Sequence, residues 1–172
     1  MKTQQIAIVI ATGTLVLAGC RSRAPEELPP TPAPVAAPTT TTAPVAQAGP
    51  QPGSQGHFEQ AVRGQNIIYF DTDRYDVDSG DQAALRTQVQ YLQQYPNVSV
   101  TLEGHADERG TREYNLALGE RRATAAKNYL VSLDIPTTRI NTVSYGKERP
   151  VVLGSDESAW AQNRRAVTVV VN

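Results

Sequence analysis

The sequence predicts an α/β fold, a two-layer sandwich in which a mixed sheet of about four strands carries helices on one face. Two observations predict it. Between residues 57 and 172, segments rich in β-branched residues alternate with segments of helical periodicity, in the order strand, helix, strand, helix, strand, strand (βαβαββ). The same stretch is long enough to bury a core without cross-links, and the chain contains a single cysteine.

The first strand and the first helix are predicted from composition and end signals. Residues 66–70 (NIIYF) form a continuous apolar run, which is typical of a central strand covered on both faces. Residues 78–95 repeat apolar side chains at helical spacing. Ser79 and Gln82 have the spacing of a capping box at the start of this helix, and Pro96 ends it.

The rest of the domain continues this alternation. In residues 98–103, valine and leucine alternate with polar residues, which predicts a strand. A helix is expected over residues 112–133, and the segment Asp134-Ile135-Pro136 ends it. The remaining expected elements are strands at residues 140–145 and 165–171, with a short helical turn at 157–162 between them.

One arginine interrupts the apolar face of the helix at residues 112–133. At about 100° of turn per residue, Tyr114, Leu118, Ala125 and Tyr129 fall in one sector about 60° wide. Ala126 and Leu133 widen this apolar sector to about 120°, and Arg122 falls inside it. A lone buried charge is costly, so we expect this arginine to reach solvent or to find an anionic partner. Asp107, in the charged loop before the helix, is the nearest source of such a partner.

Two interpretations of these two residues are open. In the first, Arg122 and Asp107 form a structural ion pair that ties the loop to the helix, and such pairs are common. In the second, they form a split trap for a zwitterion. Arg122 then offers a forked donor to a carboxylate, and Asp107 accepts hydrogen bonds from an ammonium group. Residues that wait for such a ligand need not touch each other.

Composition argues against several function classes. The formal net charge is −1 and the aromatic content is 6%, so neither a basic field nor a stacking platform indicates a nucleic-acid partner. The chain has no GxSxG or HExxH motif. Asp107 and Glu108 are adjacent in one loop and do not form two opposed carboxylates. We therefore expect a protein that is not an enzyme.

No metal or other cofactor is expected. His57 and His105 are the only histidines and lie far apart in the sequence, which makes a poor zinc site. A hydrogen bond that positions the loop is the expected role of His105. The acidic run at residues 71–76 fits the start of a calcium-binding EF-hand loop but fails its later positions, so a calcium site is not expected.

The first 20 residues have the pattern of a bacterial export signal. Lys2 precedes an apolar segment at residues 6–18, which is shorter than the roughly 20 residues of a transmembrane helix. The sequence Leu17-Ala18-Gly19-Cys20 resembles the lipobox, in which the cysteine is acylated and becomes the new N-terminus. An ordinary signal with an incidental cysteine is the alternative. Arg21 follows the cysteine instead of a retention aspartate, which favours the outer membrane.

Residues 21–56 are expected to form a disordered tether. Nine of the 12 prolines lie in this segment, and no apolar period in it could build a core. Such a chain reaches about 35 Å as a flexible coil and at most about 110 Å as stiff polyproline II. The tether would therefore hold the domain at residues 57–172 clear of the membrane.

Four segments together resemble the outer-membrane-protein-A-like domain family, in sequence and in order. They are NIIYFDTDRYDV, GHADERGTREYNLALGERRA, VSYGKERPVVLG and NRRAV. The resemblance covers nearly everything after about His57. It implies an OmpA-like fold and non-covalent, non-catalytic binding of the diaminopimelate residue in the peptidoglycan stem peptide.

The resemblance also implies the site residues. The aspartate of the family's loop motif falls on Asp107 and the arginine of its helix motif on Arg122, which favours the zwitterion trap. The other residues expected at the ligand are Phe70, Asp71, Thr72 and Leu118. The residues expected to support the loop are Gly104, His105, Gly110, Tyr114 and Asn115.

Arg121 lies at the edge of the apolar stripe of its helix and is expected to be a solvated or structural charge. Arg164 and Arg165 precede the last strand, where a basic pair either solubilises a sheet edge or faces an acidic partner.

Two broader functions are open. The resemblance implies a lipoprotein anchored in the outer membrane at Cys20 that links this membrane to peptidoglycan within the Tol system, and so supports envelope integrity and cell division. The alternative is a periplasmic interaction hub whose main ligand is a TolB-like protein.

Overall fold

A computed structural model describes residues 49–171 of the chain. The expected signal peptide at residues 1–20, the lipidation site at Cys20 and most of the expected tether at residues 21–56 lie outside the described residues. The elements of the described part are, in order, α1 (Gln55–Ala61), β1 (Ile67–Tyr69), α2 (Ser79–Gln94), β2 (Ser99–His105), α3 (Arg112–Ser132), η1 (Thr137–Arg139), β3 (Ile140–Gly146), α4 (Glu157–Asn163) and β4 (Arg165–Val171). None of these helices has the length and apolar character needed to cross a bilayer.

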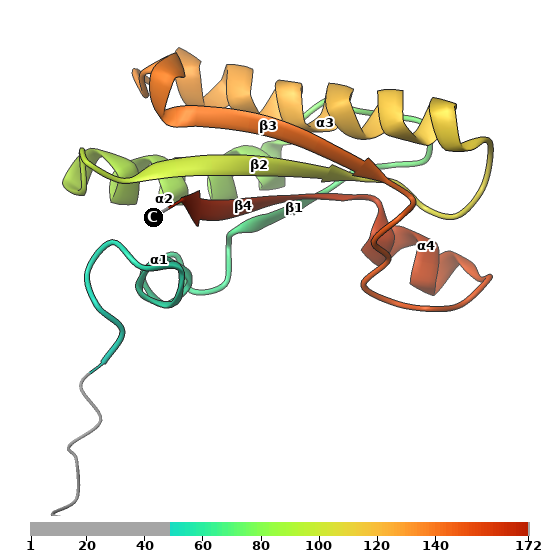
Figure 1. The fold of residues 1–172 in the computed structure, drawn as a ribbon, viewed down its shortest axis with the longest axis horizontal. Coiled ribbons are helices and arrows are strands. Elements are labelled where there is room, and N and C mark those ends of the chain that lie inside the picture. The colour runs from blue at the N-terminus through green and yellow to red at the C-terminus, as the bar shows by residue number, and fades with distance from the viewer. Residues whose placement is uncertain (1–48, 172) are drawn as a thin grey trace, which may run out of the picture. The chain divides into compact units, whose positions relative to one another are not determined.

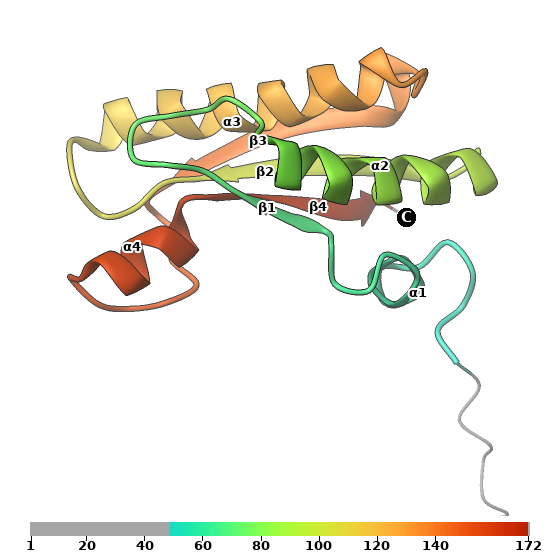
Figure 2. The ribbon, with the colours of Figure 1, turned by 180° about the vertical axis from the view of Figure 1, so that it is seen from behind.

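The four strands form one mixed sheet in the order β1-β4-β2-β3. β2 and β3 are parallel and are joined by a crossover through α3, whereas β4 runs antiparallel to both of its neighbours. Figure 1 shows the strands in front of α2, and Figure 2, seen from behind, shows α2 in front of the strands. The predicted two-layer α/β sandwich is confirmed.

The predicted central position of residues 66–70 is wrong. β1 has three residues, pairs only with β4 and lies at the edge of the sheet. Tyr69 in this strand is 49% exposed. Phe70, which continues the apolar run past the end of β1, is buried against Arg122. The centre of its ring lies 5.2 Å from the guanidinium carbon of Arg122. The interior strands are instead β4 and β2.

Helix α3 has the predicted extent, but its buried face is turned from the predicted one. The buried residues are Asn115, Leu118, Gly119, Arg122, Ala123, Ala126 and Leu130. Tyr114 is 48% exposed. The cause is a close approach of helix to strand, because a Cβ atom added to Gly104 would lie 1.8 Å from the carbonyl oxygen of Gly119. The helix therefore packs on β2 through its smallest residues, and the large aromatic rings are left at the margin.

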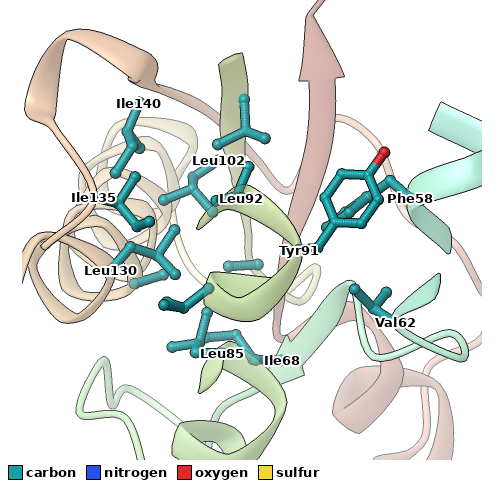
Figure 3. Packing of buried hydrophobic residues seen from close by; sticks show 14 of the residues in the cluster. Phe58, Val62, Ile68, Leu85, Tyr91, Leu92, Leu102, Leu130, Ile135 and Ile140 are labelled. Atoms are coloured by element: carbon teal, nitrogen blue, oxygen red, sulfur yellow. The ribbon is translucent and has the colours of Figure 1, made fainter. Parts of the chain in front are cut away.

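The core lies between the sheet and helices α2 and α3. Figure 3 shows Leu85 and Leu92 of α2 packed near Leu102 of β2 and Leu130 of α3. Ile135 and Ile140, which flank η1, complete this side of the cluster. Each of these side chains is at most 2% exposed, so the core is formed by non-local contacts between helices and strands.

The capping box predicted for the first helix is displaced by one residue. Asp78 is the N-cap of α2, and its carboxylate accepts a hydrogen bond of 2.8 Å from the N–H of Asp81. The Gln82 side chain donates to the carbonyl of Val77 instead of returning to the cap. An aspartate at the cap satisfies the free N–H groups of the first turn as well as a serine does.

Helix α1 was not predicted and begins two residues before His57. Ser54 caps it by accepting a hydrogen bond from the N–H of His57 at 3.3 Å. Phe58 is fully buried against the ring of Tyr91. The Gln55 side chain accepts a hydrogen bond of 2.7 Å from the N–H of Val170, which fastens α1 to the end of β4. The helix is held by tertiary contacts that periodicity cannot reveal in seven residues.

Candidate functional site

A cavity of about 260 Å³ opens where the loop after β1, the loop after β2 and the start of α3 meet. Its walls are formed by Thr72, Asp73, Asp107, Arg109, Gly110, Tyr114, Asn115, Leu118 and Arg122. Both charged residues singled out from the sequence, Asp107 and Arg122, therefore line one space.

Arg122 is fully buried and is held by backbone carbonyl groups. Its Nε donates to the carbonyl of Arg74 at 2.9 Å and its Nη2 to that of Asp71 at 3.0 Å. Its Nη1 donates to the carbonyl of His105 at 2.8 Å. Within the described residues Arg122 therefore neither reaches solvent nor pairs with an acid, because three of its N–H groups donate to uncharged carbonyl oxygens.

The Arg122 guanidinium is still available to a ligand. Burial, and then the nearby charge of Arg164, lower the pKa of Arg122 to about 10, so the group is protonated at neutral pH. A guanidinium carries five N–H groups, and the hydrogen bonds to described residues use three of them. Two N–H groups of Arg122, which lines the cavity, therefore have no hydrogen-bond partner among the described residues.

Asp107 is paired with Arg109 of its own loop. Arg109 Nη2 lies 2.6 Å from Oδ2 and Arg109 Nε 3.0 Å from Oδ1, and the Arg109 backbone N–H also donates to Oδ1 at 3.1 Å. Arg164 Nη1 lies 3.5 Å from Oδ2. Burial raises the pKa of the Asp107 carboxyl, but the hydrogen bonds from Arg109 outweigh it and hold that pKa below its usual value.

No ion pair joins Arg122 to Asp107 among the residues that the structure describes. The interpretation of these two residues as a structural pair is therefore wrong. They line the same cavity from different elements, with opposite charges and without direct contact.

The remaining predicted ligand residues divide between two cavities. Thr72 and Leu118 line the cavity with Arg122, whereas Phe70 and Asp71 line a second cavity of about 330 Å³. Asp71 supports the first site through its carbonyl, which holds Arg122. Phe70 supports it through its ring, which packs against the guanidinium of Arg122.

The predicted support residues hold the loop in different ways. Asn115 Nδ2 donates to the carbonyl of Arg109 at 2.6 Å, and Gly110 adopts a left-handed φ of 81° at the turn of the loop. Tyr114 donates from its hydroxyl to Asp73 at 3.2 Å. Lys147, which was not predicted, donates to the carbonyl of Gly110 at 2.6 Å. The loop is thus fixed largely through backbone atoms.

His105 does not act as expected. Neither ring nitrogen has a hydrogen-bond partner among the described residues, and the contribution of this residue to the site is its carbonyl oxygen. Burial, and then the positive charges of Arg165 and Arg149, lower its pKa to about 4, so the ring is neutral at pH 7. Gly104 lies beside it at the contact between β2 and α3 and does not line the cavity.

Sequence reasoning did not single out Arg109 or Asp73 as cavity residues, and it left two roles open for Arg164. Arg164 is 6% exposed, lies beside the interior strand β4 and contacts acidic groups, so it faces acidic partners within the chain and does not solubilise a sheet edge. Its Nε donates to the carbonyl of Phe70 at 2.9 Å and its Nη2 to Glu157 at 2.7 Å. The only signal in the sequence was the charge itself, because the composition of one strand does not determine its place in the sheet.

Comparisons with known proteins agree with this architecture. The sequence profile described as the OmpA family matches residues 69–164, a range that contains every residue lining the cavity. The chain is 48% identical to the peptidoglycan-associated lipoprotein of Rhizobium meliloti (strain 1021) over 165 residues, which cover 96% of this chain and 85% of that protein. The protein of the same name from Agrobacterium fabrum is 54% identical over 119 residues, or 69% of this chain and 66% of that one.

A solved structure also agrees with the described architecture. The crystal structure of the peptidoglycan-associated lipoprotein from Burkholderia pseudomallei matches with a TM-score of 0.63 and 44% sequence identity. The match covers 66% of this chain and 96% of that chain. The described fold is therefore the one that this relative has along nearly its whole crystallised length.

Asp107→Asn should lower the free energy of unfolding at neutral pH by about 2 kcal/mol, because Arg109 and Arg164 lose a charged acceptor. The folded pKa of Asp107 lies below the unfolded value of about 3.9, so the carboxylate stabilises the fold above that pH and ceases to do so as the pH falls through the folded pKa. Urea denaturation of both proteins should give a difference that is constant above about pH 5 and shrinks below about pH 4. A difference that persists undiminished at about pH 2 would contradict this account.

Proposed function

The chain belongs to the OmpA family, and from this premise we propose that it is an outer-membrane lipoprotein that binds peptidoglycan non-covalently through the diaminopimelate residue of the stem peptide. The free end of that residue carries a carboxylate and an ammonium on one carbon. The proposal includes no chemical step, because recognition of these two charges is sufficient for reversible attachment.

One observation carries the proposal: a single cavity is lined by a buried guanidinium and a carboxylate that do not pair with each other. Arg122 donates its unused N–H groups to the ligand carboxylate, and Asp107 accepts from the ligand ammonium. Thr72 and Leu118 border the ligand, and Asn115 keeps the loop in shape.

The expected affinity is moderate. Hydrogen bonds to charged groups contribute about 1.5 to 3 kcal/mol each, and association costs several kcal/mol in lost freedom. The difference corresponds to a dissociation constant on the order of micromolar. Such an affinity suits attachment that must be released and remade as the cell wall grows.

Co-sedimentation with purified peptidoglycan tests the ligand site. Asp107→Asn and Arg122→Lys should each weaken binding by about tenfold or more, because each removes a charge-assisted contact with the ligand. The matched control is Arg121→Ala, since Arg121 is the adjacent residue of α3 but is exposed and does not line the cavity.

Circular dichroism must establish that each variant is folded. If Arg122→Lys fails to fold, Asp107→Asn decides alone, since its side chain makes no contact with the core cluster that the fold requires. Folded Asp107→Asn protein that sediments as wild type does would refute the proposed site.

The attachment to the membrane belongs to the same proposal. Residues 1–20 would be removed as a signal peptide, Cys20 would carry the lipid, and residues 21–56 would act as the tether. Each buried CH₂ of an acyl chain contributes about 0.8 kcal/mol, so several chains on one cysteine hold a protein stably. The relatives' shared name, which contains the word lipoprotein, supports this part.

Cys20→Ala should abolish incorporation of labelled palmitate and move the protein from the membrane fraction to the soluble fraction. The chain has no other cysteine, so no second thiol can replace it. Fractionation of cells that express each form measures this, and a variant that stays with the outer membrane would contradict the anchor.

A role in the Tol-Pal system, in envelope integrity and in cell division extends the proposal to a protein partner. The family resemblance supports this role, and a TolB-like protein is the partner we propose. The alternative function, an interaction hub with such a protein as its main ligand, would use the same surface.

Cross-linking in the presence of excess muropeptide separates these functions. We expect the yield of the cross-linked complex with a TolB-like protein to fall as muropeptide is added, because both ligands use the surface around the cavity. An unchanged yield would indicate independent sites, and a complex without any peptidoglycan binding would favour the hub.

A further inference from the structure

The Arg109 side chain is hydrogen-bonded to the carboxylate of Asp107, which the proposed ligand needs as an acceptor. Both oxygens of Asp107 accept hydrogen bonds from the Arg109 side chain, at 3.0 and 2.6 Å, in a bidentate arrangement. The bidentate fork is the strongest geometry for a guanidinium on a carboxylate. With the bond from the Arg109 backbone N–H, these contacts use three of the roughly four lone-pair sites of the carboxylate, so an ammonium that approaches Asp107 meets a largely occupied acceptor.

The Arg109 side chain rests on further supports. Its Nη2 lies 3.3 Å from Oγ1 of Thr72, and its guanidinium carbon lies 4.2 Å from the ring centre of Trp160. The indole N–H of Trp160 donates to Glu108 at 3.1 Å, which fixes the ring. Arg109 also lines the cavity with Arg122. The Arg109 side chain thus borders the space proposed for the ligand.

The geometry points to Arg109 as an internal competitor, a guanidinium that holds the acceptor site of Asp107 in the free protein and that the ligand ammonium must displace. The inference rests on the proposed function, since it concerns the same cavity. In this inference Arg109 regulates the affinity of the cavity for its ligand. The Arg109 side chain then has different conformations in the free and the bound protein.

Displacement requires little reorganisation. The Arg109 side chain is 38% exposed, so release moves it towards solvent and does not strand a buried charge. Asp107 raises the pKa of Arg109 most, and the negative charges of Glu157 and Asp73 raise it further, so two other negative charges remain near this side chain after release.

The loop keeps its shape without the side chain. The backbone N–H of Arg109 donates to Asp107, and its carbonyl accepts from Asn115 at 2.6 Å. Lys147 fixes the carbonyls of Glu108 and Gly110. None of these contacts needs the guanidinium, so a substitution at residue 109 changes the competitor and leaves the loop in place.

The first measurement compares affinities by calorimetry, with a muropeptide tripeptide that carries diaminopimelate as the probe. Arg109→Gln should bind about fivefold more tightly than wild type, because a partly exposed ion pair no longer has to be broken. Arg112→Gln is the matched control. It removes one positive charge three residues further along, where Arg112 pairs with Glu148 at the surface, and its affinity should equal that of wild type.

The second measurement uses the fluorescence of Trp160, the only tryptophan of the chain. Because the Arg109 guanidinium lies against the indole ring, its displacement should change the emission when muropeptide is added to wild type. In Arg109→Gln the same addition should leave the emission unchanged, although the ligand binds.

The outcomes separate this inference from the function on which it rests. Asp107→Asn that binds the probe as wild type does would refute the proposed site itself. If Asp107→Asn loses binding while Arg109→Gln binds equally or more weakly than wild type, only the competitor is overturned. Emission that responds equally in wild type and Arg109→Gln, or in neither, would also overturn it.

Discussion

The buried guanidinium of Arg122 is the interaction on which the cavity depends. Its hydrogen bonds join the loop after β1, through the carbonyls of Asp71 and Arg74, to the end of β2, through the carbonyl of His105. Three segments far apart in the sequence therefore meet at one side chain of α3. Carbonyl oxygens satisfy the N–H groups without cancelling the charge, so a full positive charge remains inside the domain. The same side chain shapes the cavity and places a positive charge in its wall.

Neighbouring charges shift the pKa of the Arg122 guanidinium. Arg164 lowers the pKa of Arg122, whereas the negative charge of Asp107 raises it. Asp107 in turn lies between Arg109 and Arg164. Positive groups thus surround one deeply placed carboxylate, and an added carboxylate reduces their mutual repulsion. In the competitor inference, a ligand ammonium replaces the Arg109 guanidinium at Asp107, so the charge there stays balanced. A zwitterion would supply both this ammonium and the added carboxylate.

Helical periodicity was sufficient to identify Arg122 as a charge on a buried face, because the spacing of α3 is regular. It could not identify the partners, since these are carbonyls whose positions depend on the path of a loop. The partner of Asp107 was misjudged for a similar reason: a residue two positions away in a tight turn competes with one on a distant helix. The edge position of β1 and the burial of Arg164 follow from strand order, which the composition of a single segment does not determine.

The attachment of α1 to β4 has a mechanical consequence. Gln55 holds the start of the domain to Val170 at one end of this strand, and Arg164, which immediately precedes its other end, contacts Asp107 (Figure 1). Under the attachment proposed above, a pull between the N-terminus and a ligand in the cavity would load both ends of β4, which lie roughly 20 Å apart. The hydrogen bonds of β4 to β1 and β2 would then be loaded in shear, all at once, instead of opening one after another.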